Sequence, residues 1–134
     1  MHFLVPIDGS EASFRAVEFA AKLAGGGNSK LTILAVRQYI VGRHMVSAFL
    51  SEEEVDVLLV RAKELAAASG AKQVLSAQLN ARDVSHAIVS YAEEHEVDLI
   101  VMGASGIGGF KAFLIGSIST EVLKKSICPV AIVH

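Results

Sequence analysis

The chain has 134 residues, of which 52% are apolar and 19% charged, with a formal net charge of -2. That length fits one domain, and the near-neutral charge argues against a general nucleic-acid binder, which carries a strong basic excess. The apolar fraction excludes intrinsic disorder, yet no run reaches the roughly 18 apolar residues of a membrane-spanning helix. Because Cys128 is the one cysteine and no secretory signal is visible, we expect a cytoplasmic protein.

The first half of the sequence alternates strand and helix patterns. Residues 3–7 form an apolar run ending in a turn signal, which predicts a strand with Pro6 at its carboxyl end. Ser10 has the character of an N-cap for the helix that follows. A second buried strand is expected at 31–36. Residues 37–50 have no clear period, so we expect a long loop or a loosely helical lid there.

The second half continues the alternation. Ser51 and Glu54 have the spacing of a capping box at the start of the next helix. Asp83 and Ser117 are expected to cap the two later helices. The strands expected in this half are residues 73–79, 98–102 and 129–133.

These strands are short aliphatic runs rather than alternations of apolar and polar residues. Such runs are typical of a parallel sheet that is buried on both faces. We therefore expect one α/β domain over residues 1–134, with a doubly wound, Rossmann-like, five-stranded parallel sheet and helices on both faces. In such a sheet, ligands bind outside the carboxyl ends of the strands, at the topological switch point.

The segment from Gly103 to Ser117 is the most informative candidate for a binding site. Gly103 directly follows a buried strand, and Gly116 and Ser117 open a helix. Glycine lets backbone N–H groups approach an anion, and a helix N-terminus adds unpaired donors and partial positive charge. These properties fit a phosphate cradle. A glycine-rich connection leading to a capped helix remains the alternative interpretation.

Sharper motifs are absent from this segment. A dinucleotide-binding fingerprint starting at Gly106 would need glycine at Lys111, and a P-loop would need lysine where Phe110 follows Gly109. A nucleophile elbow starting at Gly103 would need glycine at Ile107. The five histidines have no metal-ligand spacing, so no metal site is predicted from them.

The spacing of Gly103, Gly106, Gly116 and Ser117 resembles the ATP-binding motif of the universal stress protein family. The resemblance covers nearly the whole chain: residues 5–10 look like the family's opening strand, 97–103 like its fourth strand, and 123–133 like its closing helix and strand. It implies an adenine-nucleotide-binding protein, with ATP or AMP and with Mg²⁺ as a further candidate, that acts as a stress-response sensor or regulator. It also implies a homodimer formed through the last strand.

The resemblance assigns roles by position. Asp8 would contact the ribose, and the adenine pocket would be lined by Pro6, Ile7, Val36 and Met102. The phosphates would be held by Gly103, Gly106, Gly116, Ser117 and the amide of Ile118. No catalytic residue is assigned.

Two positions depart from the family pattern. Asn80-Ala81-Arg82 replaces a glycine followed by proline or an acidic residue, and Ser105 stands where nucleotide binders often have a basic residue or histidine. Arg82, Lys111 or Arg37 could supply the missing counter-charge. The alternatives are a dimeric interaction protein with a vestigial site and a slow ATPase in which Asp8 helps to hold Mg²⁺.

Overall fold

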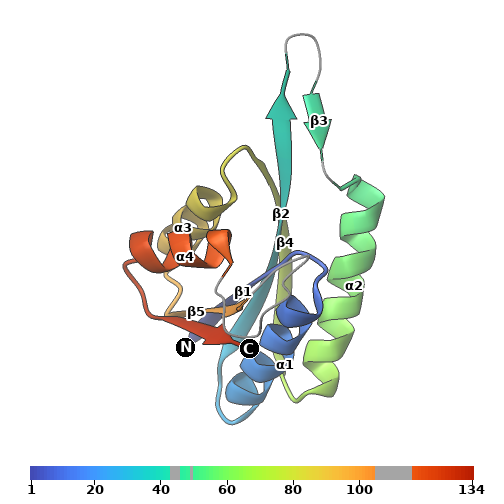
Figure 1. Ribbon diagram of the computed structural model, residues 1–134. Coiled ribbons are helices and arrows are strands. Elements are labelled where there is room, and N and C mark those ends of the chain that lie inside the picture. The colour runs from blue at the N-terminus through green and yellow to red at the C-terminus, as the bar shows by residue number, and fades with distance from the viewer. Residues whose placement is uncertain (43–45, 49, 105–115) are drawn as a thin grey trace.

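The computed structural model describes residues 1–42, 46–48, 50–104 and 116–134. Within these ranges strands and helices alternate along the chain (Figure 1). The elements are β1 (His2–Ile7), α1 (Glu11–Gly25), β2 (Lys30–Val41), β3 (Val46–Ala48), α2 (Glu52–Ala68), β4 (Gln73–Ala81), α3 (Val84–Glu94), β5 (Leu99–Gly103), α4 (Ser117–Lys125) and β6 (Val130–Val133).

Five strands form a parallel sheet in the order β4-β2-β1-β5-β6. The chain first moves outward from β1 through β2 to β4, and then returns to the other side of β1 for β5 and β6. This reversal places the switch point between β1 and β5. The predicted fold class, a doubly wound five-stranded parallel sheet, is therefore confirmed.

Helices cover both faces of the sheet, with α1 and α2 on one side and α3 and α4 on the other (Figure 1). Successive strand residues alternate between the two layers, as strand geometry requires. In β1, Val5 packs under α1 and α2, whereas Leu4 packs in the layer of α3 and α4. Both side chains are fully buried, and each burial of this kind contributes about 1.5–3 kcal/mol. Double burial explains why the central strands β1, β2 and β5 contain continuous apolar runs, whereas the edge strand β4 is partly exposed and carries polar residues.

The prediction of an irregular loop at 37–50 is wrong for the residues that the structure describes. The second strand continues to Val41, and Tyr39, Ile40 and Val41 pair antiparallel with β3. This β2–β3 hairpin projects beyond the rest of the molecule (Figure 1). Arg37 and Gln38 interrupt the apolar pattern, so the strand signal at Tyr39 to Val41 was not recognised as its continuation.

The N-caps predicted at Ser10, Ser51 and Asp83 are confirmed, since each side chain accepts a hydrogen bond from the backbone N–H three residues later. The capping box of Ser51 and Glu54 is complete in both directions. Among the described residues, no helix has the length and apolar character needed to cross a membrane.

Candidate functional site

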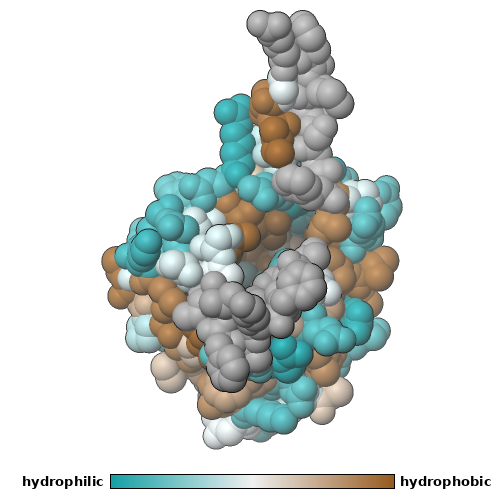
Figure 2. Space-filling model, in the orientation of Figure 1, coloured by the Kyte–Doolittle hydropathy of each residue, from teal (hydrophilic) through white to brown (hydrophobic). Residues whose placement is uncertain are grey.

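The carboxyl ends of β1 and β5 lie side by side at the switch point. Their ladder contains two residue pairs, Phe3 with Leu99 and Leu4 with Ile100. Pro6 lies farther along β1, opposite Leu34 of β2, and as a proline it has no N–H to donate to a ladder. It sits one residue before the end of β1, which confirms the prediction that it lies at the carboxyl end of the strand. Figure 2 shows a hollow in this part of the surface, between the α3–α4 side and the α2 side.

A tight turn follows β1 and presents Asp8. The Oδ1 atom of this exposed carboxylate accepts the Ser10 N–H at 2.9 Å, so Asp8 closes the turn that leads into α1. Gly9 has a φ of +87°, a left-handed conformation that favours glycine. Ser10 then caps α1 by accepting the Ser13 N–H at 3.2 Å. One oxygen of Asp8 is thus used by the turn, and the exposed carboxylate also faces solvent, where a ligand hydroxyl could reach it.

The N-terminus of α4 is fixed beside the end of β5 by two hydrogen bonds. The Gly116 N–H donates to the Ala104 carbonyl at 2.6 Å, and the Ser119 hydroxyl donates to the Gly103 carbonyl at 3.0 Å. Neither Ala104 nor Ser119 was singled out from the sequence, since nothing distinguishes them locally from any small residue near a helix start. They determine where the helix N-terminus lies relative to the switch point.

The N-cap of α4 is Gly116, and among the residues that the structure describes no side chain makes a capping hydrogen bond to the helix. The prediction that Ser117 is the cap is wrong, because Ser117 is already the first helical residue and its side chain is exposed. The first backbone N–H groups of a helix have no partner within it and carry partial positive charge. With Ile118 39% exposed next to it, this end of α4 can accept an anion.

Gly103 is explained by packing as well as by the motif. An added Cβ would lie 2.6 Å from the backbone carbon of Ala12 and 2.7 Å from its carbonyl oxygen. The first turn of α1 therefore rests directly on the end of β5, and only glycine permits this approach. The predicted phosphate contact of Gly103 stays a prediction, and the contact with α1 is a second requirement for glycine that the sequence did not indicate.

The apolar candidates are divided between the two layers of the core. Met102 is 6% exposed and shares the α3–α4 layer with half-buried Val36. Pro6 is buried, and its position two residues after Leu4 directs it to the same layer. Ile7 is also buried, but its side chain belongs to the α1–α2 layer. The structure thus brings together Pro6, Val36 and Met102 and turns the Ile7 side chain away from them.

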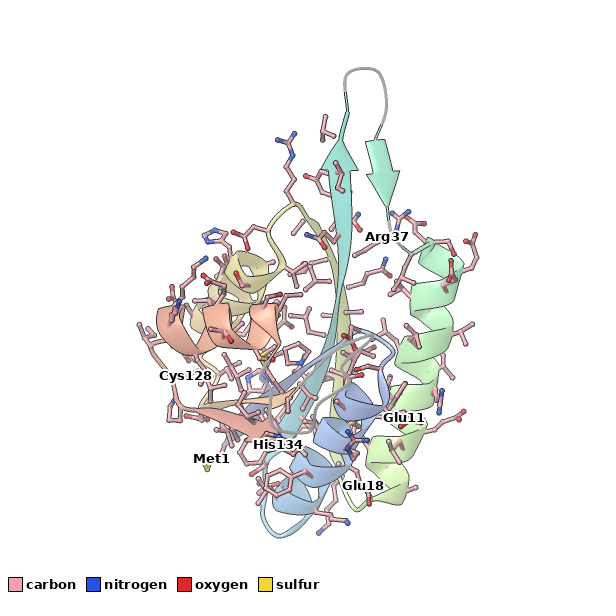
Figure 3. All side chains as sticks on the ribbon, viewed as in Figure 1. Met1, Glu11, Glu18, Arg37, Cys128 and His134 are labelled. Atoms are coloured by element: carbon pink, nitrogen blue, oxygen red, sulfur yellow. The ribbon has the colours of Figure 1, made fainter. Side chains whose placement is uncertain are left out.

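Two of the three candidate counter-charges belong to the hairpin region. Arg37 donates through Nε to the Leu50 carbonyl at 2.6 Å, and Figure 3 shows it between the hairpin and the start of α2. Arg82 lies over the ring of Tyr39 at 5.9 Å. The glycine at 106, together with Ser105 and Lys111, lies outside the described residues. In the described ranges, no group of three or more His, Cys, Asp or Glu residues is placed to hold a metal ion.

Comparisons with known proteins agree with this architecture. The sequence profile of the universal stress protein family matches residues 1–134. Universal stress protein YxiE of Bacillus subtilis is 36% identical, with 98% of this chain and 97% of that protein covered. Universal stress protein Rv1636 of Mycobacterium tuberculosis is 33% identical, with 98% and 94% covered.

Solved structures show the same fold. A universal stress protein in complex with cAMP superposes with a TM-score of 0.80 at 28% identity, covering 100% of this chain and 96% of that one. A universal stress protein from Archaeoglobus fulgidus gives a TM-score of 0.78 at 23% identity, with 100% and 93% covered, and is similar in fold. With a family profile that spans the entire sequence and relatives above 30% identity over nearly their full length, the chain belongs to the universal stress protein family.

Proposed function

We propose that this chain binds an adenine nucleotide, ATP or AMP, at the switch point and acts as a cytoplasmic stress-response sensor or regulator. The observation that carries the proposal is the uncapped N-terminus of α4, held beside the end of β5 by the Gly116 and Ser119 hydrogen bonds. Backbone donors fixed in advance bind an anion without first losing conformational freedom.

The residue roles follow from this position. The phosphates would lie at Gly116, Ser117 and the Ile118 amide, with Gly103 and Gly106 in the same glycine-rich motif. Asp8 would accept a hydrogen bond from the ribose through its exposed carboxylate. The apolar group of Pro6, Val36 and Met102 offers a surface for the adenine ring, and Ile7 would contribute through its backbone.

The similar structure solved with cAMP supports a nucleotide of this class. Adenine, ribose and phosphate are all present in cAMP, so its binding by a relative at 28% identity favours the same three subsites here. If Mg²⁺ accompanies a bound triphosphate, Asp8 is the nearby carboxylate that could reach it, since hard cations prefer oxygen ligands.

A homodimer through β6 is part of the proposal. Within the described ranges this strand pairs with β5 on one side only, and all its residues are half-buried. An apolar edge strand with unpaired backbone groups invites another strand. Pairing of two β6 strands would cover both edges and place two nucleotide sites in one assembly.

Native mass spectrometry of freshly purified protein, followed by calorimetric titration with AMP, ATP and cAMP, tests the proposal. Gly116→Val should weaken AMP binding at least about tenfold, because its side chain would occupy the anion position. The extended backbone of Gly116, with φ -63° and ψ 161°, accommodates valine without strain. Ser117→Ala should weaken binding less, through loss of a single hydroxyl.

Gly26→Val is the matched control, since a Cβ at Gly26 meets its nearest atom at 3.8 Å and lies at the far end of α1. Unchanged affinity in Gly116→Val would contradict the site. If wild-type protein carries no nucleotide and binds none, the vestigial-site alternative is favoured instead.

A further inference from the structure

The solvent-facing side of α2 carries an apolar ridge where a surface helix is normally polar. Val57 is 67% exposed and Val60 is 57% exposed. They lie opposite the side of α2 that is buried on the sheet, which includes Val55, Leu59 and Ala62. We call this surface the α2 outer face and define it by Glu53, Glu54, Asp56, Val57, Val60, Arg61, Lys63 and Glu64.

The α2 outer face also has a shallow, open depression. Asp56, Val57, Val60, Arg61 and Glu64 line it. Figure 2 shows apolar surface among hydrophilic side chains on the side where α2 lies. Valine is a mediocre helix former, so two valines exposed on one ridge gain nothing from helix propensity. An apolar contact would account for them.

Each side of the ridge formed by Val57 and Val60 carries one acidic and one basic residue, so the same surface of a second copy could pair with them. Asp56 and Lys63 are seven residues apart, about two turns, and so lie on one flank of the ridge. Glu54 and Arg61 have the same spacing on the other flank. On each flank the acid comes first along the chain and the base second.

Asp56 and Lys63 are available for an external partner, whereas the Glu54 carboxylate also accepts the Ser51 N–H in the capping box. Within the described part of the chain, neither Asp56 nor Lys63 has an ion-pair partner. Arg61 is held in place by stacking of its guanidinium over the Phe14 ring at 4.4 Å. An oriented cation loses less freedom when it pairs with a carboxylate than a mobile one does.

We propose that the α2 outer face docks against the same face of a second copy of this chain, with the two helices antiparallel about a two-fold axis. Such an axis reverses chain direction but keeps each flank against the same flank of the other copy. Val57 then meets Val60 of the other copy. Asp56 meets Lys63 on one flank, and Glu54 meets Arg61 on the other.

One pair opposes this arrangement. Glu53 lies opposite Glu64 of the other copy, near the centre of the contact, and two carboxylates there repel. The pairing is therefore expected to be weak and reversible near neutral pH, and to become stronger when one of these charges is removed. A parallel arrangement is worse, because its two-fold axis exchanges the flanks and brings Asp56 near Glu54, and Lys63 near Arg61, of the other copy.

The contact is independent of the proposed function. The helix α2 packs on β2 and β4, whereas the proposed strand dimer uses β6 at the opposite edge of the sheet. Pairing through α2 leaves β6 open, so a strand dimer would associate further into tetramers or longer assemblies. Nucleotide affinity and α2 pairing can therefore succeed or fail separately.

Charge reversal in full-length protein tests the geometry. Sedimentation equilibrium of the wild type should show one species that persists on dilution. Above it, the average molar mass should rise reversibly with protein concentration. Asp56→Lys alone and Lys63→Asp alone should each weaken that step about tenfold, because the dimer loses two attractions and gains two repulsions. A one-to-one mixture of the two variants should restore the step, since every Lys then faces an Asp.

The double variant Asp56→Lys with Lys63→Asp should also associate with itself, and Glu53→Gln should strengthen the wild-type step. Glu94→Lys on α3 is the matched control for a charge reversal at an exposed position and should change nothing. Circular dichroism confirms that each variant is folded. The proposal is overturned if the wild type shows no such step, or if the mixture of single variants fails to restore it.

Discussion

The carbonyl oxygen of Ala104 accepts the N–H of Gly116 at 2.6 Å, across eleven intervening residues. This bond joins the end of β5 to the start of α4, so the helix N-terminus points at the switch point. The Ser119 hydroxyl reinforces the junction through the Gly103 carbonyl. The proposed binding at this edge would therefore depend on backbone groups whose positions are determined before a ligand arrives.

Replacing Gly103 with alanine should destabilise the protein. The new Cβ would lie 2.6 Å from the Ala12 backbone, so α1 must shift away from β5. Overpacking of this kind costs about 1–3 kcal/mol, which urea denaturation would report as a lower midpoint with an unchanged slope. Gly26→Ala, where the nearest atom is 3.8 Å away, should have little effect. Equal stability of Gly103→Ala and wild type would contradict this prediction and show that α1 can shift away from β5 without a loss of folding free energy.

The two roles of Asp8 can be separated. Asp8→Asn retains an oxygen that accepts the Ser10 N–H, so the melting temperature should stay close to that of the wild type. Asp8→Ala loses the turn bond and should melt earlier. Both should bind AMP about tenfold more weakly if the charged carboxylate holds the ribose. Wild-type affinity in Asp8→Asn would mean that the residue serves the turn alone.

Stability should fall as the pH drops below the ordinary histidine range, because of His2. This residue is 7% exposed. Its Nδ1 lies 3.2 Å from the His95 carbonyl and its Nε2 lies 2.8 Å from the Thr32 hydroxyl. Since the carbonyl can only accept, Nδ1 donates to it and the neutral ring accepts from Thr32 through Nε2. Burial lowers the pKa of His2, with a smaller contribution from Lys30, while the His95 carbonyl and Asp98 oppose the shift.

Proton linkage gives the direction in which the stability changes with pH. A lowered pKa in the folded state means that the unfolded chain binds the proton first as pH falls below about 6.5. The stabilising contribution is thus complete above pH 6.5 and is lost as pH falls toward the folded-state pKa. Urea denaturation at pH 7.5 and pH 5 should show a larger loss for wild type than for His2→Gln. Parallel losses in the two proteins would exclude His2 as the cause.

Arg37 should hold the β2–β3 hairpin against the start of α2. Its Nε donates to the Leu50 carbonyl at 2.6 Å, and Glu52 lies 3.9 Å from its Nη1. In Arg37→Ala, amide hydrogen exchange at residues 39–41 should accelerate about tenfold, since a hydrogen bond to a charged group is lost. The amides of β1 should be unaffected. Lys22→Ala, which breaks an exposed ion pair with Glu18, should leave the hairpin unchanged.

Structural features that depend on residues close together in the sequence were predictable, whereas features that depend on packing between distant elements were not. The caps at Ser10, Ser51 and Asp83 depend on residues within three positions and were predicted correctly. The extension of β2 depends on pairing with β4 at Arg37 and Gln38 and with β3 at residues 39–41, which no periodicity in residues 37–50 reveals. The cap of α4 was assigned to Ser117 from residue type alone, whereas hydrogen bonds to β5 make Gly116 the boundary residue.

The same distinction applies to the candidate site. Strand order and the general rule for α/β sheets were sufficient to predict that the segments with Asp8 and Gly103, which follow or end β1 and β5, lie at one edge of the sheet. The Ile7 side chain lies in the opposite layer of the core from Met102, which the sequence did not reveal. The face of the sheet to which a side chain points depends on the register of its strand with the neighbouring strands. The contact between Gly103 and Ala12 depends on the angle at which α1 crosses β5, which is a property of the packed domain.

The central position of β1 has a consequence for how the chain folds. Its partner on one side, β2, begins at Lys30, but its partner on the other side, β5, begins at Leu99. During synthesis the first strand therefore emerges long before its second neighbour, and one of its edges stays open while α2, β4 and α3 are made. Pairings so distant in sequence slow folding and prolong exposure of apolar surface. Until β5 is made, this nascent chain should be a substrate for chaperones that bind exposed strands.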